Sequence, residues 1–175
     1  HTVSIGERSG QLGGQNPTAI ETCSIGISEN PGISIKVSPD ANFISYCLNN
    51  NSIKLFRFNA ASGTIFPNNC NFVQDSKYPQ VAFSPSGRYL YTAEEDLSNN
   101  EISISQHSLK DFNDRLCSIP RKKIFSKDAN DPNEYYFTEL FLQEGADGRI
   151  YFSRYSDNPY KSRMLGVILY PEAET

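Results

Sequence analysis

A strand, a tight turn and a second strand recur three times along this chain, and this repeated unit limits the folds that the chain can adopt. The three turns lie at residues 38–42, 84–88 and 145–149. Proline fixes the backbone at the first corner of such a turn, and Gly or Asp tolerates the left-handed conformation at a later corner. The flanking residues are rich in Val, Ile, Phe and Tyr, as strands are. The sequence therefore predicts β-hairpins.

The spacing of the turns predicts a repeat architecture. Pro39, Pro85 and Ala146 stand at intervals of 46 and 61 residues. Each hairpin is followed by another strand candidate, at 52–58, 101–108 and 164–170. A repeat of about 40 to 50 residues with several short strands is typical of a propeller blade.

Evidence for helix is nearly absent, because only residues 108–115 show helical spacing, and we interpret these as a turn or one short helix. We therefore predict an all-β chain of about three four-stranded antiparallel blades. The expected blade units cover residues 20–72, 73–125 and 135–171 of a single segment, 1–175.

Three segments also carry a resemblance to a known family. Residues 36–40, 81–91 and 142–151 have the sequences KVSPD, VAFSPSGRYLY and LQEGADGRIY. They resemble the WD-repeat-like β-propellers of exported Bacteroidetes proteins, in many of which the propeller precedes a type IX secretion sorting domain or adhesive modules. The resemblance spans about residues 33–171, with Ala41 in place of the turn glycine and Ala146 in place of proline.

This resemblance implies a location and a function. We expect an extracellular, cell-surface or periplasmic protein, in which the propeller is a non-catalytic binding or spacing scaffold for a protein or a glycan. The alternative is a lactonase-like hydrolase with its site in the central channel, because such enzymes use a turn like that at 84–88 followed by acidic residues. Only His107 is available as an internal histidine, so the chain is poorly supplied for that chemistry.

Composition excludes several other functions. The chain has 175 residues and a net charge of −4, which argues against nucleic acid as the main partner. No apolar run approaches the roughly 18 to 20 residues of a membrane span. The glycines form no dinucleotide fingerprint, and we expect no cofactor.

The start of the chain indicates that blades are missing. The sequence opens with the strand-like residues 2–5 and has its only methionine at Met164. About three blades are fewer than the four to eight of a closed propeller. We expect a segment of a six- to eight-bladed propeller, completed by missing sequence or by a second copy.

Aromatic and basic residues near the end of the chain are candidates for recognition. Tyr155 and Tyr160 lie beside Arg154 and Arg163. Exposed tyrosines beside arginines suit binding of a protein or a glycan, whereas buried ones would pack between blades.

The sequence contains two short charged runs. Glu94 and Glu95 come after the strand predicted at 89–93 and could line a propeller mouth, or form a solvated loop. The basic run at 121–123 follows Pro120, and we expect a solvated loop there as well.

One stretch is rich in oxygen ligands. Asp128, Asp131 and Glu134 lie close together and are a candidate calcium site. Pro132 makes the same stretch natural as a turn, so we expect no metal.

The four cysteines are isolated in the sequence. Cys23, Cys47, Cys70 and Cys117 include no C-x-x-C pair, which argues against zinc and redox chemistry. They suit small core residues, or disulfides in an exported protein, and three pairings are open.

Overall fold

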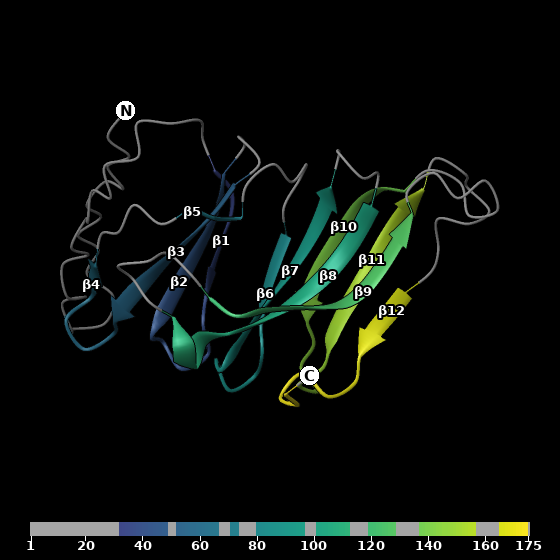
Figure 1. Cartoon of the computed structure of the whole chain (residues 1–175). Coiled ribbons are helices and arrows are strands. Elements are labelled where there is room, and N and C mark those ends of the chain that lie inside the picture. Colours follow the sequence, from purple (N-terminus) through teal and green to yellow (C-terminus); the bar gives the residue numbers. More distant parts are fainter. Residues whose placement is uncertain are drawn as a thin grey trace, which may run out of the picture.

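In a computed structural model, the described residues of the chain form β-strands and one short 3-10 helix (Figure 1). The structure describes residues 32–48, 52–66, 71–73, 80–96, 101–112, 119–128, 137–156 and 165–174. The strands are β1 (Gly32–Val37), β2 (Phe43–Leu48), β3 (Ser52–Asn59), β4 (Thr64–Phe66), β5 (Asn71–Val73), β6 (Gln80–Phe83), β7 (Tyr89–Asp96), β8 (Glu101–Ser108), β9 (Arg121–Asp128), β10 (Phe137–Glu144), β11 (Ile150–Ser156) and β12 (Leu165–Ile168), and the helix is η1 (Leu109–Asp111).

These strands form three antiparallel sheets in chain order. The first sheet has the order β1-β2-β3-β4, with β5 also paired to β3. The second has the order β6-β7-β8-β9, and the third β10-β11-β12. The all-β prediction is confirmed, although the third sheet has three strands in the described part of the chain where four were expected.

The three hairpin turns share one backbone geometry. Their fourth residues are Ala41, Gly87 and Gly148, with φ of 55°, 74° and 72°. Each donates its backbone N–H to the carbonyl three residues earlier, over 2.8, 2.8 and 3.0 Å. A side chain is strained at positive φ, so glycine suits this position. Ala41 has a Cβ at this position, so the first turn is the strained one of the three.

Neighbouring turns also approach one another. A Cβ placed on Gly87 would lie 2.5 Å from Cγ of Asp40, in the first turn. A Cβ on Gly148 would lie 3.5 Å from Cγ of Pro85, in the second turn. The turns of the three sheets therefore lie side by side at one end of the molecule.

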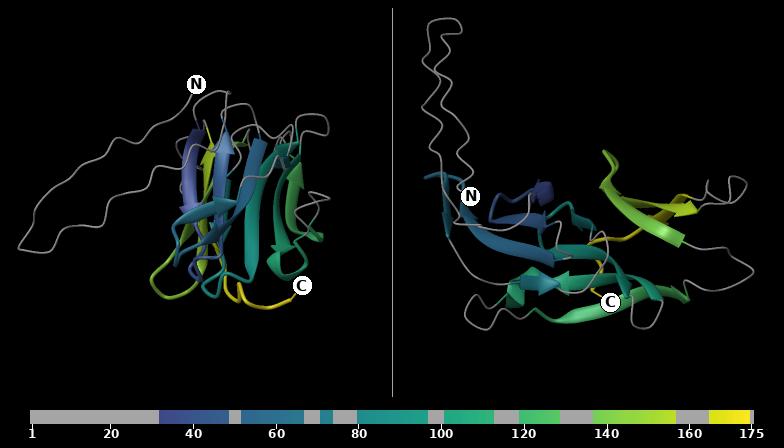
Figure 2. Two further views of the ribbon diagram at one scale, coloured as in Figure 1. Left: turned by 90° about the vertical axis from the view of Figure 1, so that its left-hand side faces the viewer. Right: turned by 90° about the horizontal axis from the view of Figure 1, so that it is seen from above.

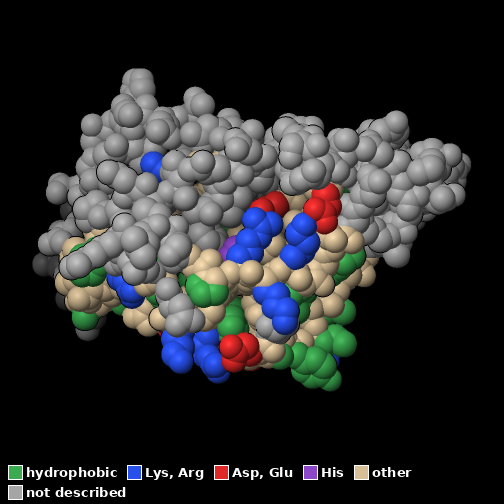
Figure 3. Space-filling view, in the orientation of Figure 1, with side chains coloured by type: hydrophobic (Ala, Val, Ile, Leu, Met, Phe, Trp, Pro, Cys, Tyr) green, Lys and Arg blue, Asp and Glu red, His purple; other side chains and the backbone are tan. Residues whose placement is uncertain are grey.

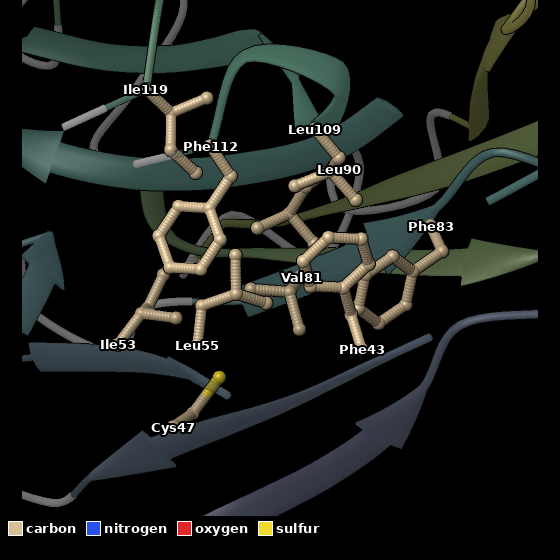
Figure 4. Close-up of a cluster of buried hydrophobic side chains, with 10 residues drawn as sticks. All are labelled: Phe43, Cys47, Ile53, Leu55, Val81, Phe83, Leu90, Leu109, Phe112 and Ile119. Atoms are coloured by element: carbon tan, nitrogen blue, oxygen red, sulfur yellow. The ribbon is translucent and has the colours of Figure 1, made fainter. Parts of the chain in front are cut away.

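The middle sheet is buried on both faces because its side chains alternate between two cores. Val81, Phe83 and Leu90 pack with residues of the first sheet such as Leu55 (Figure 4). The alternate residues Ala82, Tyr89, Tyr91 and Ala93 pack with Leu140, Leu142 and Ile150 of the third sheet. The first strands also adjoin, since β6 contacts both β1 and β10. The sheets thus stack in chain order (Figure 2).

The outward faces of the first and third sheets expose apolar side chains. Ile35 and Val37 of β1 pair with Tyr46 and Ile44, on the face opposite the core residue Cys47. Ile35 is 62% exposed. On the third sheet, Phe141, Leu165 and Val167 are exposed on the face opposite Leu140 and Leu142. Both ends of the stack therefore present apolar surface to solvent.

After β12 the chain returns to the second sheet (Figure 1). The Tyr91 hydroxyl donates to the carbonyl of Pro171 over 2.9 Å, and the Gln106 side chain donates to the carbonyl of Ala173 over 2.8 Å. Glu172 accepts the backbone N–H of Ser86 over 2.7 Å. These bonds fasten the third sheet to the second.

Two sequence expectations were wrong, and both concern charged residues. Residues 121–123 belong to β9, an edge strand paired with β8, and do not form a loop. Strand β7 runs on to Asp96, so Glu94 lies in a strand and is 8% exposed. Both predictions assumed that charged residues lie in solvated loops. An edge strand such as β9 tolerates charged side chains, and a buried carboxylate such as that of Glu94 is tolerated when it has a cationic partner.

Candidate functional site

A groove of about 800 Å³ opens between the first and second sheets at the end where the turns lie. Four segments form it: the β1–β2 turn, the end of β3 with β4, the β6–β7 turn, and η1. Its lining residues are Asp40, Ala41, Asn42, Phe43, Arg57, Phe58, Asn59, Ala60, Ala61, Phe66, Gly87, Arg88, Leu109 and Lys110. A groove of this size fits a small ligand or one or two residues of a larger one.

Arg57 is held rigidly at the groove. Its guanidinium lies over the rings of Phe43 and Phe112, 5.4 and 5.5 Å from their centroids, and donates to the carbonyl of Phe112 over 3.1 Å. The two rings meet edge to face at 5.8 Å. Such contacts orient a guanidinium while leaving its charge in place. The groove therefore has a pre-positioned cation.

Two further cations, Arg88 and Lys110, line the groove and are exposed. The Arg88 guanidinium lies 5.5 Å from the ring centroid of Tyr89. Basic side chains gather at the lower edge of the molecule beside η1 (Figure 3).

Asp40, the acidic side chain among the described lining residues, forms hydrogen bonds within its own turn. The Asp40 carboxylate accepts the Ser38 hydroxyl over 2.6 Å and the Asn42 side-chain amide over 2.7 Å. The described lining residues thus include three cations and one carboxylate, in a chain of net charge −4. This arrangement can bind an anion.

Glu94, a sequence candidate, lies in a second polar cluster on the second sheet. Its carboxylate forms an ion pair with Arg121 at 3.0 Å and accepts the Thr92 hydroxyl over 2.6 Å. Arg121 also donates to the Ser105 hydroxyl over 3.1 Å. Each carboxylate oxygen of Glu94 thus has a partner, which makes its burial tolerable.

His107 completes this cluster as a neutral side chain. Its Nε2 lies 2.9 Å from the Thr92 hydroxyl oxygen. That hydroxyl has one proton, which it donates to Glu94, so the imidazole is assigned its proton on Nε2 and donates to Thr92. Burial, and then the charge of Arg121, lower the pKa of His107 from 6.5 to about 3. A histidine of this kind suits packing better than proton transfer near neutral pH.

The side chains of the other recognition candidates lie outside the described residues. Glu95 lies in β7, and Arg154 and Tyr155 lie in β11, but their side chains fall outside the described residues. Tyr160 and Arg163 lie outside them altogether. Recognition by these residues stays a prediction.

The calcium candidate also stays a prediction. Asp128 ends β9, and Asp131 and Glu134 lie outside the described residues. Among the residues that the structure describes, no cluster of three His, Cys, Asp or Glu could hold a metal ion.

Of the cysteines, Cys47 is described as a free, fully buried thiol of the core that joins the first two sheets. Burial raises the pKa of this thiol. The small-core interpretation is therefore confirmed for Cys47, and Cys23, Cys70 and Cys117 lie outside the described residues.

Sequence reasoning missed the groove because its residues come from four separate segments. Arg57 lies within a strand candidate and carries no motif. One signal was present: Arg88 directly follows the turn glycine Gly87, so its place beside a turn was readable. Which cations gather there depends on how the sheets stack.

Comparisons with known proteins identify no family for this chain. No protein-family model matches the chain, and a search of the curated proteins also gives no match. Within the described ranges, the structure has no helix long and apolar enough to span a membrane.

Proposed function

We propose that this chain is a segment of a β-propeller that serves as a non-catalytic binding or spacing scaffold. The observation that carries the proposal is the stack of three small antiparallel sheets, in which the middle sheet is buried on both faces. Successive propeller blades bury their faces in this way, with their first strands adjoining. Here β6 contacts both β1 and β10.

The apolar outer faces support completion by further blades. Leu165 of β12 is 68% exposed and Ile35 of β1 is 62% exposed, each on the outward face of its sheet. Contiguous exposed apolar surface marks a contact site. In the proposed assembly these faces pack on further sheets of a six- to eight-bladed ring, supplied by additional sequence or by a second copy.

The groove and the Glu94 cluster support binding rather than catalysis. Among the residues that the structure describes, the groove lining includes no histidine, cysteine, serine or threonine. Glu94, which the hydrolase alternative would use, has its carboxylate engaged by Arg121 and Thr92. We propose that the scaffold binds a protein or a glycan, and that it is exported to the cell surface, the periplasm or the medium, as its resemblance to exported propellers implies.

The test is size-exclusion chromatography with light scattering on the 175-residue chain. We expect a closed dimer or larger association, because both outer faces are apolar. A replacement in an outer face, Leu165→Asp, should reduce the association, whereas Phe66→Ser, which removes an exposed apolar side chain elsewhere, should leave it unchanged. A stable monomer that binds no apolar dye would overturn the proposal.

A further inference from the structure

We propose that Ser86, Tyr91 and Gln106 of the second sheet form a binding site for a β-turn that has proline at its second position and glutamate at its third. The chain's own turn at residues 170–173, the latch turn, occupies this site. A turn of the same chemistry on another protein can displace it. The site is separate from the outer sheet faces that support the scaffold proposal.

The latch turn has a defined backbone geometry. The backbone N–H of Ala173 donates to the carbonyl of Tyr170 over 3.0 Å. Proline at the second position, here Pro171, presets the backbone for such a turn. The first hairpin turn, residues 38–41, has the same order of proline, acidic residue and alanine, and its closing N–H to carbonyl bond is 2.8 Å long. The chain therefore uses an acidic proline turn twice.

Two backbone carbonyls of the latch turn meet side-chain donors of the second sheet. The Tyr91 hydroxyl donates to the carbonyl of Pro171 over 2.9 Å, and the Gln106 amide donates to the carbonyl of Ala173 over 2.8 Å. The same amide donates to the Tyr91 hydroxyl oxygen over 2.7 Å, which orients that hydroxyl toward the turn. Burial raises the pKa of Tyr91 to about 12, so this group remains a donor at neutral pH.

The third acceptor is a side chain, and it makes the site selective for sequence. The Glu172 carboxylate accepts the backbone N–H of Ser86 over 2.7 Å and also the Ser86 hydroxyl. Asp40, at the same position of the first hairpin turn, is one methylene shorter, and its carboxylate accepts bonds from Ser38 and Asn42 within its own turn. A carboxylate also accepts stronger hydrogen bonds than an amide does. The site therefore favours glutamate over both aspartate and glutamine.

Polar contacts hold the latch turn, and the hydrophobic cores of the described residues include none of residues 169–174. The two side chains that lead into the turn face solvent, since Leu169 is 51% exposed and Tyr170 is 77% exposed. Pro171 is the buried residue of the turn. Each such hydrogen bond contributes little net free energy, so the advantage of the latch turn over a free ligand is its high effective concentration. A second chain can therefore replace it without disturbing the core.

The test opens the site in the full 175-residue chain and offers the turn as a separate peptide. The double variant Pro171→Gly/Glu172→Ala, the opened chain, lacks the proline that presets the turn and the carboxylate that binds Ser86. The probe is a blocked, fluorescently labelled peptide with the sequence LYPEAE of residues 169–174. Fluorescence polarisation measures its binding, and circular dichroism checks that the opened chain keeps its sheets. Matched peptides carry glutamine or aspartate in place of the first glutamate.

We expect the opened chain to bind the peptide at least about tenfold more tightly than the unmodified chain, in which the latch turn competes. The glutamine and aspartate peptides should each bind about tenfold more weakly. Tyr91→Phe in the opened chain should raise Kd about fivefold, because one donor is lost. Tyr89→Phe is the matched control, since Tyr89 lies in the same strand and core cluster and it is Tyr91 that binds the turn. It should leave Kd unchanged.

A second readout reports directly on the site. The backbone N–H of Ser86 donates to Glu172, so hydrogen exchange at Ser86 shows whether the site is filled. Exchange should be faster in the opened chain than in the unmodified chain. The glutamate peptide should slow it again, and the glutamine peptide should not at the same concentration.

Three results would overturn the inference. The first is no binding of the glutamate peptide to the opened chain. The second is equal binding of the glutamine peptide, which would show that the carboxylate is not recognised. The third is loss of the sheet signal in the opened chain, which would make the turn a part of the folded core that no ligand can displace. Each result leaves the scaffold proposal standing, because that proposal concerns the outer faces of the first and third sheets.

Discussion

Replacing Gly87 by alanine should destabilise the protein through two separate effects. The first is backbone strain, because Gly87 has a φ of 74°. A residue with a Cβ pays about 1–2 kcal/mol in the left-handed region. The unfolded chain loses freedom when glycine becomes alanine, which offsets about 0.5–1 kcal/mol of this. The net cost of strain is therefore about 1 kcal/mol.

The second effect is a steric conflict with the first turn. The new Cβ would lie 2.5 Å from Cγ and Oδ1 of Asp40, so the carboxyl must move. In its present place it accepts hydrogen bonds from Ser38 over 2.6 Å and from Asn42 over 2.7 Å. Losing these two bonds, of which the first is part-buried and the second exposed, costs about 0.5 kcal/mol each. The total expected for Gly87→Ala is about 2 kcal/mol.

Three matched variants separate the two effects. Gly148→Ala and Gly63→Ala share the positive φ, but their new Cβ atoms would meet only Pro85 at 3.5 Å and nothing within 4 Å, respectively. Each should cost about 1 kcal/mol, the strain alone. Ala41→Gly relieves the strain at φ 55° and should stabilise the protein by about 1 kcal/mol, the same difference with the opposite sign.

The assay is urea unfolding followed by circular dichroism, with the free energy of unfolding from linear extrapolation. The double variant Asp40→Ala/Gly87→Ala should cost less than the sum of its single changes, since the conflict disappears. Equal costs for Gly87→Ala and Gly148→Ala would refute the contact between the turns. A loss of stability with Ala41→Gly would refute the strain in the first turn.

Two further predictions concern pH. His107 has a pKa lowered from 6.5 to about 3 by burial and by Arg121, so the unfolded chain binds more protons between these values and stability falls with acidification. In urea unfolding, the free energy of unfolding should fall by about 2–3 kcal/mol between about pH 6.5 and about pH 4.5. The fall should be smaller in His107→Gln. Equal falls in the two proteins would contradict a buried neutral imidazole. Partial burial raises the pKa of Glu172, but its hydrogen bonds from Ser86 outweigh this and hold the pKa below 4.5. The contribution of Glu172 to stability is thus present above pH 4.5 and is lost as pH falls through the lower pKa of the folded state. Glu172→Gln should therefore flatten the plot of unfolding free energy against pH in that acidic range. An unchanged plot would show that Glu172 does not hold the segment after β12.

The hairpins were predictable from sequence because their signals are local. Proline, glycine and aspartate define the turns, and alternating apolar residues define the strands beside them. The strand predicted at 101–108 coincides with β8, Glu101–Ser108. The sequence also shows that Ala41 stands in place of the turn glycine. The positive φ that this alanine adopts is set by the turn around it.

The buried charges were not predictable because their partners are distant in sequence. Glu94 is buried only because Arg121 of β9 reaches it across β8. A basic run after proline has the composition of a loop, yet the hydrogen bonds of the edge strand determine its conformation. The groove has the same origin, since Arg57 and Lys110 meet only once two sheets are stacked.

The central claim is that the sheets stack head to tail, so that the outer face of the third sheet fits the outer face of the first. Sedimentation velocity on two variants, Ile35→Asp and Leu165→Asp, tests it directly, because each variant keeps one intact face. We predict that each variant alone is a monomer and that an equimolar mixture forms a dimer. A dimer of either variant alone, or a mixture that stays monomeric, would contradict the propeller arrangement.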